Sequence, residues 1–130
     1  MKTAEDVRDS LADVPQMKTI KELCDQVGIT ARAARFYETI GLVAPMRNEK
    51  RRFYSSADVE KVEMIVALKR FRFTLAEIRE LLTETQREWD RYPLTPQRCQ
   101  QQIAFLQVER QEIERAIVDL TAFQAALTAD

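Results

Sequence analysis

Basic side chains in two short stretches carry the most evident binding chemistry of this chain. Arg32 and Arg35 are three positions apart, which places them on one face of a helix. Four further cations fall within six positions: Arg47, Lys50, Arg51 and Arg52. Arginine offers a planar fork of donors that fits a phosphate or the edge of a guanine, and lysine offers a point charge. The pattern predicts a site for a polyanion, while a solvated loop remains the alternative for residues 47–52.

The distribution of charge agrees with this prediction, although the whole chain of 130 residues has a net charge of −1. From Lys18 to Tyr54 eight basic residues accompany four acidic ones, a net of +4. From Glu84 to the end five basic residues accompany eight acidic ones, a net of −3. A basic front half with an acidic tail is typical of a protein that presents one end to phosphates.

Catalytic and metal chemistry find little support in the sequence. Histidine is absent, and no carboxylate pair or nucleophile with a neighbouring base stands out, so we predict no catalytic residue and no enzyme activity. Cys24 and Cys99 are far apart and form neither a disulfide framework nor a zinc pattern, so we expect no cofactor and no metal. For Cys99 two interpretations stay open, a half-buried residue and a thiol that senses redox state.

Composition places the chain among helical, cytoplasmic proteins. No apolar run approaches the ~18 residues of a membrane span, and the polar N-terminus has no signal-peptide core, so we expect no membrane partner. The sequence has only 2 glycines and 4 prolines, which favours helix over turns.

Two helices joined by a glycine turn are predicted to position the first basic pair. Thr19 is suited to cap a helix that ends at Gly28, and Thr30 is suited to cap a second that runs to Gly41. This is the helix-turn-helix pattern, which helical hairpins that bind no DNA also share. The second helix carries both arginines, with Phe36 and Tyr37 beside them. Its N-terminal half is therefore suited to the major groove of DNA.

The second basic stretch falls in a predicted two-stranded wing. Two short extended segments within residues 42–54 flank a polar, charged turn. A third helix is predicted to begin at residues 55–58, and a capping box of Thr74 and Glu77 predicts the start of a fourth. These two helices would pack behind the first pair, which gives a mainly α head over residues 18–83.

A long C-terminal helix is predicted to begin at Thr95 and Pro96 and to continue to about Leu127. Side chains at alternating spacings of four and three form a heptad seam along it. The seam consists of Ile103, Leu106, Arg110, Ile113, Ile117, Leu120, Gln124 and Leu127. At 1.5 Å per residue such a helix spans ~45–50 Å, too far for the head to cover. A second copy of the chain is the expected partner, and a helix folded back on the head is the alternative.

The remaining segments flank these elements. Residues 1–17 form an extension, for which a short amphipathic helix and disorder are both open. Residues 84–94 form a connector, and residues 95–130 contain the dimerisation helix and a tail. Trp89 and Tyr92 in the connector either line a small effector pocket or fill the core.

An ordered series of motifs over residues 19–82 resembles the MerR family of bacterial transcriptional regulators. The motifs are Arg35-Phe36-Tyr37-Glu38, Gly41-Leu42, Pro45-x-Arg47, Arg52-Phe53-Tyr54 and Thr74-Leu75-x-Glu77. The resemblance implies a winged helix-turn-helix head and a long helix that pairs with its copy as an antiparallel coiled coil.

The resemblance also implies roles for individual residues. Five would lie on the recognition helix at the major groove: Thr30, Arg32, Arg35, Phe36 and Tyr37. Arg47, Arg52 and Tyr54 would contact the DNA backbone from the wing. Members bind an inverted repeat in double-stranded DNA as homodimers, between promoter elements that are too far apart. An effector on the C-terminal part lets the dimer bend and untwist the DNA, which realigns the promoter for RNA polymerase.

Three departures from the family pattern bear on these expectations. Lys50 and Arg51 replace a usual Gly-Tyr pair, so the wing turn is expected to differ. Arg72 stands where a glycine is usual between the third and fourth helices, which puts the usual turn there in doubt. Phe36 replaces a tyrosine and lacks a hydroxyl for phosphate. An architectural DNA-binding protein, or an adaptor that binds protein with the same head, is the alternative function.

Overall fold

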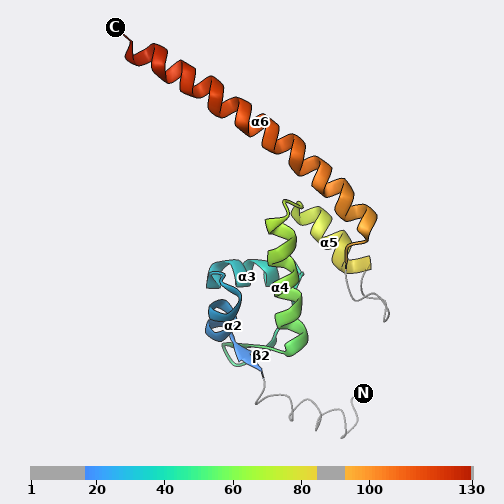
Figure 1. Ribbon diagram of the computed structural model, residues 1–130. Coiled ribbons are helices and arrows are strands. Elements are labelled where there is room, and N and C mark those ends of the chain that lie inside the picture. The colour runs from blue at the N-terminus through green and yellow to red at the C-terminus, as the bar shows by residue number, and fades with distance from the viewer. Residues whose placement is uncertain (1–16, 85–92, 130) are drawn as a thin grey trace, which may run out of the picture. The chain divides into compact units, whose positions relative to one another are not determined.

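The computed structural model describes residues 17–84 and 93–129. Helices dominate it, which confirms the mainly α prediction (Figure 1). The elements are β1 (Lys18–Thr19), α2 (Ile20–Val27), α3 (Ala31–Thr39), β2 (Met46–Asn48), β3 (Arg51–Tyr54), α4 (Ser56–Arg70), α5 (Leu75–Glu84) and α6 (Pro96–Thr128).

Side-chain caps set where the helices begin. At α2 the backbone N–H of Glu22 donates to the Thr19 hydroxyl (3.2 Å), and the N–H of Thr19 donates to the Glu22 carboxylate (3.1 Å). Thr74 and Glu77 make the same reciprocal pair at the start of α5. Such capping boxes satisfy backbone donors that have no partner inside the helix.

A small antiparallel sheet includes the predicted wing and one further strand. β2 and β3 form the hairpin, with Arg47 opposite Arg52 and Asn48 opposite Arg51. The strand that sequence analysis did not predict is β1, which pairs with the other edge of β3 and completes the order β1-β3-β2. A strand of two residues is too short to show an alternating pattern in the sequence, so β1 is recognised only by its pairing with β3.

Arg72 takes the conformation that glycine usually supplies at the turn between α4 and α5. Its φ is 71°. Its N–H donates to the Lys69 carbonyl (3.0 Å), and that of Phe73 donates to the Leu68 carbonyl (3.1 Å). This pair of bonds is the Schellman ending of a helix. The turn doubted from the sequence is therefore present, with a left-handed arginine that costs roughly 1–2 kcal/mol.

The chain divides between Arg79 and Glu80 into two compact units. The first has a core of large side chains that are at most 1% exposed. They are Leu23, Tyr54, Val62, Ile65, Leu68 and Ile78. Three helices of this head, α2, α3 and α4, are arranged around that core (Figure 1).

In the second unit, α6 is a helix of 33 residues. Its N-cap Thr95 accepts from the Arg98 N–H (3.1 Å), and Pro96 is its first residue. The predicted seam is largely uncovered within the chain, since Ile113 is 57% and Leu127 69% exposed. Pairing with a second copy therefore stays a prediction for this helix, and so does the alternative in which it folds back on the head. None of the helices in the described part of the chain is both long and apolar enough to cross a membrane.

Candidate nucleic-acid interface

The second helix of the helix-turn-helix, α3, has a buried side and a basic exposed side. Thr30 caps it, because its hydroxyl accepts from the Ala33 N–H (3.1 Å). Ala34 and Tyr37 are 2% and 3% exposed and fix the helix in the head. Arg32 and Arg35 are exposed. A helix held from one side by apolar contacts can present the two guanidinium groups of the other side to a groove.

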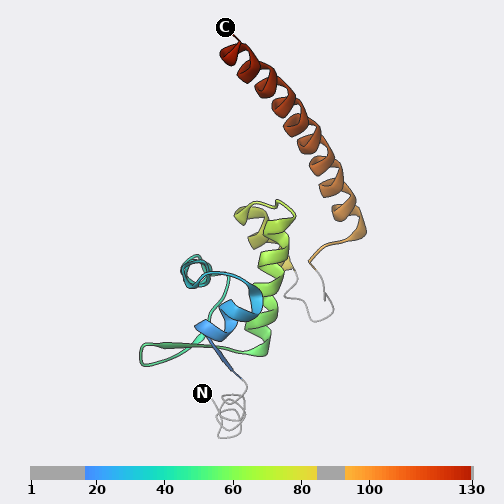
Figure 2. The same cartoon turned by 60° about the vertical axis from the view of Figure 1, so that its left-hand side comes forward.

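The wing presents its cations at the end of a hairpin. Figure 2 shows the strands β2 and β3 projecting from the head. The loop between them consists of Glu49 and Lys50, and Glu49 has a φ of 59°. The turn therefore forms without the glycine that such a backbone usually requires. Lys50 and Arg51 are both exposed at this tip.

Glu38 joins the recognition helix to the wing. Its Oε1 accepts from Arg47 Nε (3.0 Å) and Nη2 (2.5 Å), and its Oε2 accepts from Arg52 Nε (2.5 Å). Burial opposes the charge of this carboxylate, but the hydrogen bonds from Arg52 and Arg47 outweigh it. The pKa of Glu38 therefore lies below its usual value. The two arginines are not equally available, since the side chain of Arg47 is 58% exposed and that of Arg52 22%.

Two of the residues expected to contact DNA are buried in this structure, and their contact with DNA stays a prediction. Tyr37 and Tyr54 are only 3% and 1% exposed and belong to the core of the head. Tyr54 Oη has no hydrogen-bond partner among the described residues, and burial raises the pKa of its hydroxyl. Both aromatic rings pack in the apolar interior of the head, where they help to position α3 and β3. The neighbouring Phe36 is 44% exposed and remains available to DNA.

Sequence analysis missed two residues that the structure brings to this region. One is Glu38, which sequence analysis quoted within a family motif without giving it a role. The residues next to it in the sequence do not indicate that distant arginines are its partners. The other is Lys69 of α4, whose exposed ammonium lies 5.8 Å from the centre of the Tyr37 ring. Its position beside α3 depends on how α4 packs, which the sequence around it does not reveal.

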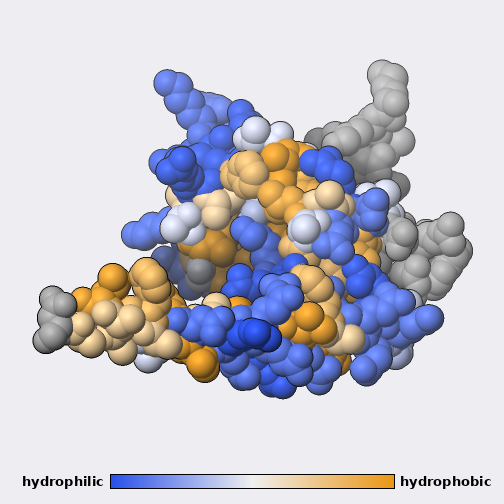
Figure 3. Space-filling view, turned by 90° about the horizontal axis from the view of Figure 1, so that it is seen from above, coloured by the Kyte–Doolittle hydropathy of each residue, from blue (hydrophilic) through white to orange (hydrophobic). Residues whose placement is uncertain are grey.

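The exposed face of α6 is the second candidate site. The seam residues Ile103, Ile113, Ile117, Leu120 and Leu127 are exposed, and so are Phe105, Val108, Val118 and Phe123. Arg110 and Gln124 interrupt the seam as predicted and are also exposed, while Leu106 is half-buried. A groove near the C-terminal end is lined by Ile117, Leu120, Thr121, Phe123, Gln124 and Leu127. Figure 3 shows this end of α6, on the left of the view, as mostly hydrophobic.

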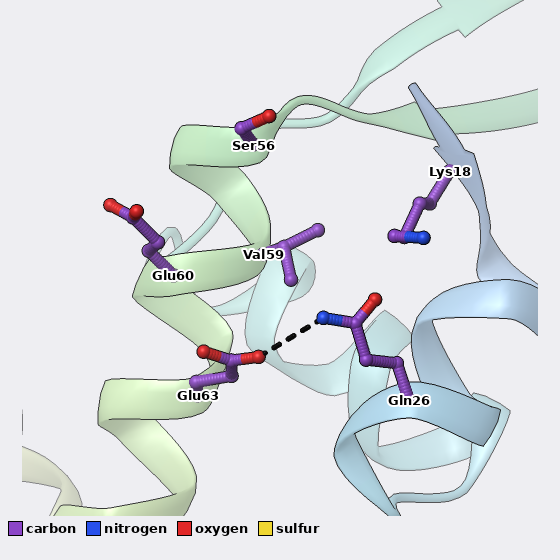
Figure 4. A pocket seen from close by; sticks show the side chains of 6 residues that line it. All are labelled: Lys18, Gln26, Ser56, Val59, Glu60 and Glu63. Carbon is purple, nitrogen blue, oxygen red and sulfur yellow. Dashed lines mark hydrogen bonds between the residues drawn. The ribbon is translucent and has the colours of Figure 1, made fainter. Parts of the chain in front are cut away.

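Another hollow lies between β1, α2 and α4 and differs in chemistry (Figure 4). Its lining is Lys18, Gln26, Ser56, Val59, Glu60 and Glu63. Gln26 Nε2 donates to Glu63 Oε1 (3.2 Å). Carboxylates face this hollow from α4, so it is poorly suited to phosphate and we leave it outside the interface.

Neither cysteine is among the residues assigned to the two candidate sites. Cys24 is half-buried in α2, and burial raises the pKa of its thiol. Cys99 is half-buried near the start of α6. No group of three or more possible metal ligands occurs within residues 17–84 and 93–129. Trp89 and Tyr92 lie outside the described residues, so their part in an effector pocket stays a prediction.

Comparison with known proteins agrees with this geometry. A family model described as "MerR HTH family regulatory protein" matches residues 18–85, and one described as "MerR, DNA binding" matches residues 59–129. The "Mercuric resistance operon regulatory protein" of Bacillus cereus is 32% identical over 110 residues, which is 83% of this chain and 78% of the relative. The "HTH-type transcriptional regulator YfmP" of Bacillus subtilis (strain 168) is 38% identical over 72 residues, 53% of this chain and 51% of the relative.

Solved structures share the fold at lower identity. A MerR family transcriptional regulator from Bacillus cereus superposes with a TM-score of 0.68 at 23% identity, over 86% of this chain and 80% of its own. The EcmrR–DNA complex gives 0.62 at 18% identity, over 84% of this chain and 39% of its own. The family models and the relative that shares 32% identity together show that the chain belongs to the MerR family of transcriptional regulators.

Proposed function

We propose that the protein binds an inverted repeat in double-stranded DNA as a homodimer, with α3 in the major groove and the wing on the backbone. The observation that carries this proposal is the two-sided character of α3. Tyr37 and Ala34 anchor one side in the core, while Arg32 and Arg35 are exposed on the other. A basic hairpin is tied to the same helix through Glu38.

The exposed residues divide into base-reading and phosphate-binding groups. Arg32 and Arg35 can pair with the acceptor edge of a guanine, and the ring of Phe36 can contact a thymine methyl group. Thr30 lies at the start of α3, where a phosphate also meets the positive end of the helix dipole. The other exposed cations of the wing and α4 can neutralise the backbone without regard to sequence. They are Arg47, Lys50, Arg51 and Lys69.

The dimer is proposed to form along α6. Its exposed apolar side chains follow the heptad spacing that pairs helices. Polar residues in a seam fix register and partner orientation, which we assign to Arg110 and Gln124. An antiparallel pairing, as the family resemblance implies, would place one head at each end of the coiled coil. Two heads related by a twofold axis require an inverted repeat.

Regulation is proposed to work through DNA shape. A dimer that spans two half-sites can bend and untwist the DNA between them, at a cost that depends on sequence. In a promoter whose elements are spaced too far apart, this distortion would realign them for RNA polymerase. HiNmlR, a MerR family regulator with a similar fold (TM-score 0.51 at 18% identity), was solved bound to promoter DNA. A regulator of this kind works at the chromosome, which for a bacterial protein means the cytoplasm.

Selection from a random duplex pool tests the proposal with the full chain. Binding is carried out at ~100–150 mM salt, where nonspecific phosphate binding is suppressed. We expect an enriched inverted repeat, and we expect it to disappear in the control variant Arg32→Ala/Arg35→Ala. Binding without enrichment, lost as salt rises, would favour an architectural role. An absence of DNA binding would favour a protein-binding adaptor.

A further inference from the structure

Glu38 binds Arg47, one of the cations that we propose to contact phosphate, and it also binds Arg52. Arg47 and Arg52 face each other across β2 and β3, and like charges placed directly opposite destabilise a strand pair. The Glu38 carboxylate lies between their guanidinium groups and accepts hydrogen bonds from both. In the free protein the wing is therefore partly neutralised by a residue of the recognition helix.

The two arginines differ in how easily a phosphate can replace Glu38 as their hydrogen-bond partner. Arg52 is 22% exposed and binds one carboxylate oxygen through Nε. Arg47 is 58% exposed and binds the other oxygen through Nε and Nη2. Free guanidinium donors of Arg47 therefore face solvent, where a phosphate can compete with Glu38, while Arg52 keeps its carboxylate partner.

We infer that Glu38 is a specificity-determining residue, which withholds Arg47 from phosphates until α3 is seated in its matching site. The inference rests on the proposed DNA-binding function and deepens it. On nonspecific DNA the wing must displace Glu38 without help from base contacts. On the matching repeat, contacts between α3 and the bases bring the DNA backbone to Arg47. The free energy of these contacts then compensates for the displacement of Glu38. The carboxylate thus lowers affinity for nonspecific DNA more than affinity for the operator.

Glu38→Gln tests the inference, because it keeps the size of the side chain and removes its charge. Each additional phosphate contact steepens the plot of log K against log salt by about 0.9. For each protomer, we expect the slope on nonspecific duplex to steepen by about that much and the affinity at ~100 mM salt to rise roughly three- to eightfold. Affinity for the selected repeat should change less, so the ratio of specific to nonspecific binding should fall.

Glu49→Gln is the matched control. It removes the same charge from the loop of the same hairpin, where no ion pair of Glu49 is described. General electrostatics predicts the same effect in both variants, whereas our inference predicts a steeper slope only for Glu38→Gln. The double variant Glu38→Gln/Arg47→Gln should return the slope to the wild-type value. Circular dichroism and thermal unfolding establish that each variant is folded.

The possible outcomes separate the two proposals. Wild-type protein that binds the repeat, with a Glu38→Gln slope equal to the wild-type or Glu49→Gln slope, would overturn the role of Glu38 alone. Wild-type protein that binds no duplex overturns both proposals. A Glu38→Gln variant that is folded but loses affinity equally for all DNA would reduce Glu38 to a structural brace.

Discussion

Replacing Ile113 with aspartate tests whether the apolar face of α6 is the dimer interface. Ile113 is 57% exposed in the single chain and is not one of the buried core residues of the head. Burying an isoleucine side chain stabilises by about 1.5–3 kcal/mol, and a twofold dimer buries two of them. Losing both costs roughly 3–6 kcal/mol, and the desolvation of two new charges adds to that. The dissociation constant of the dimer should therefore rise by at least about two orders of magnitude, at about 1.4 kcal/mol for each factor of ten.

Sedimentation equilibrium over a range of concentrations measures this constant. Gln111→Asp is the matched control, since it places the same charge in the same helix at an exposed position that faces another side. We expect Ile113→Asp to be monomeric at concentrations where the wild type and the control are dimeric. A dimeric Ile113→Asp, or equal dissociation of the control, would refute the assignment of the seam.

The other predictions concern the head. Arg35→Ala should weaken operator binding by about 1–3 kcal/mol and relax the preference at one base pair; unchanged affinity for a randomised operator in a mobility-shift titration would remove Arg35 from base reading. Arg72→Gly relieves a left-handed arginine and should raise the free energy of unfolding by roughly 0.5–1 kcal/mol, after the greater freedom of glycine in the unfolded chain is subtracted; urea denaturation with no gain would contradict this. Tyr54→Phe removes a buried hydroxyl that has no partner among the described residues, so stability should rise by about 1 kcal/mol and DNA affinity should stay constant; a loss of affinity would return Tyr54 to the DNA surface.

Helix starts were predictable from sequence because their causes are local. Thr19 with Glu22 and Thr74 with Glu77 make the bonds that their spacing predicts. The seam of α6 was predicted from spacing alone, and most of its side chains are exposed in the single chain. The residues that form each of these features lie within one helical turn or one helix.

The features that sequence did not predict depend on distant partners. β1 exists because Lys18 pairs with Tyr54. Tyr54 follows the basic run and resembles a surface residue, yet the packing of the head buries it. Glu38 acquires its role only when the hairpin folds back on α3. Which side chains of a basic segment are free, and which are already paired, is decided by tertiary structure.

The uncovered face of α6 links the output of this protein to gene dosage. If two chains are needed to hold two heads on one site, the binding species forms by mass action between protomers. While protomers outnumber dimers, dimer concentration follows the square of protomer concentration, so halving synthesis leaves about a quarter of the dimer. Expression level and the strength of one helix contact would then jointly set a threshold for switching the promoter.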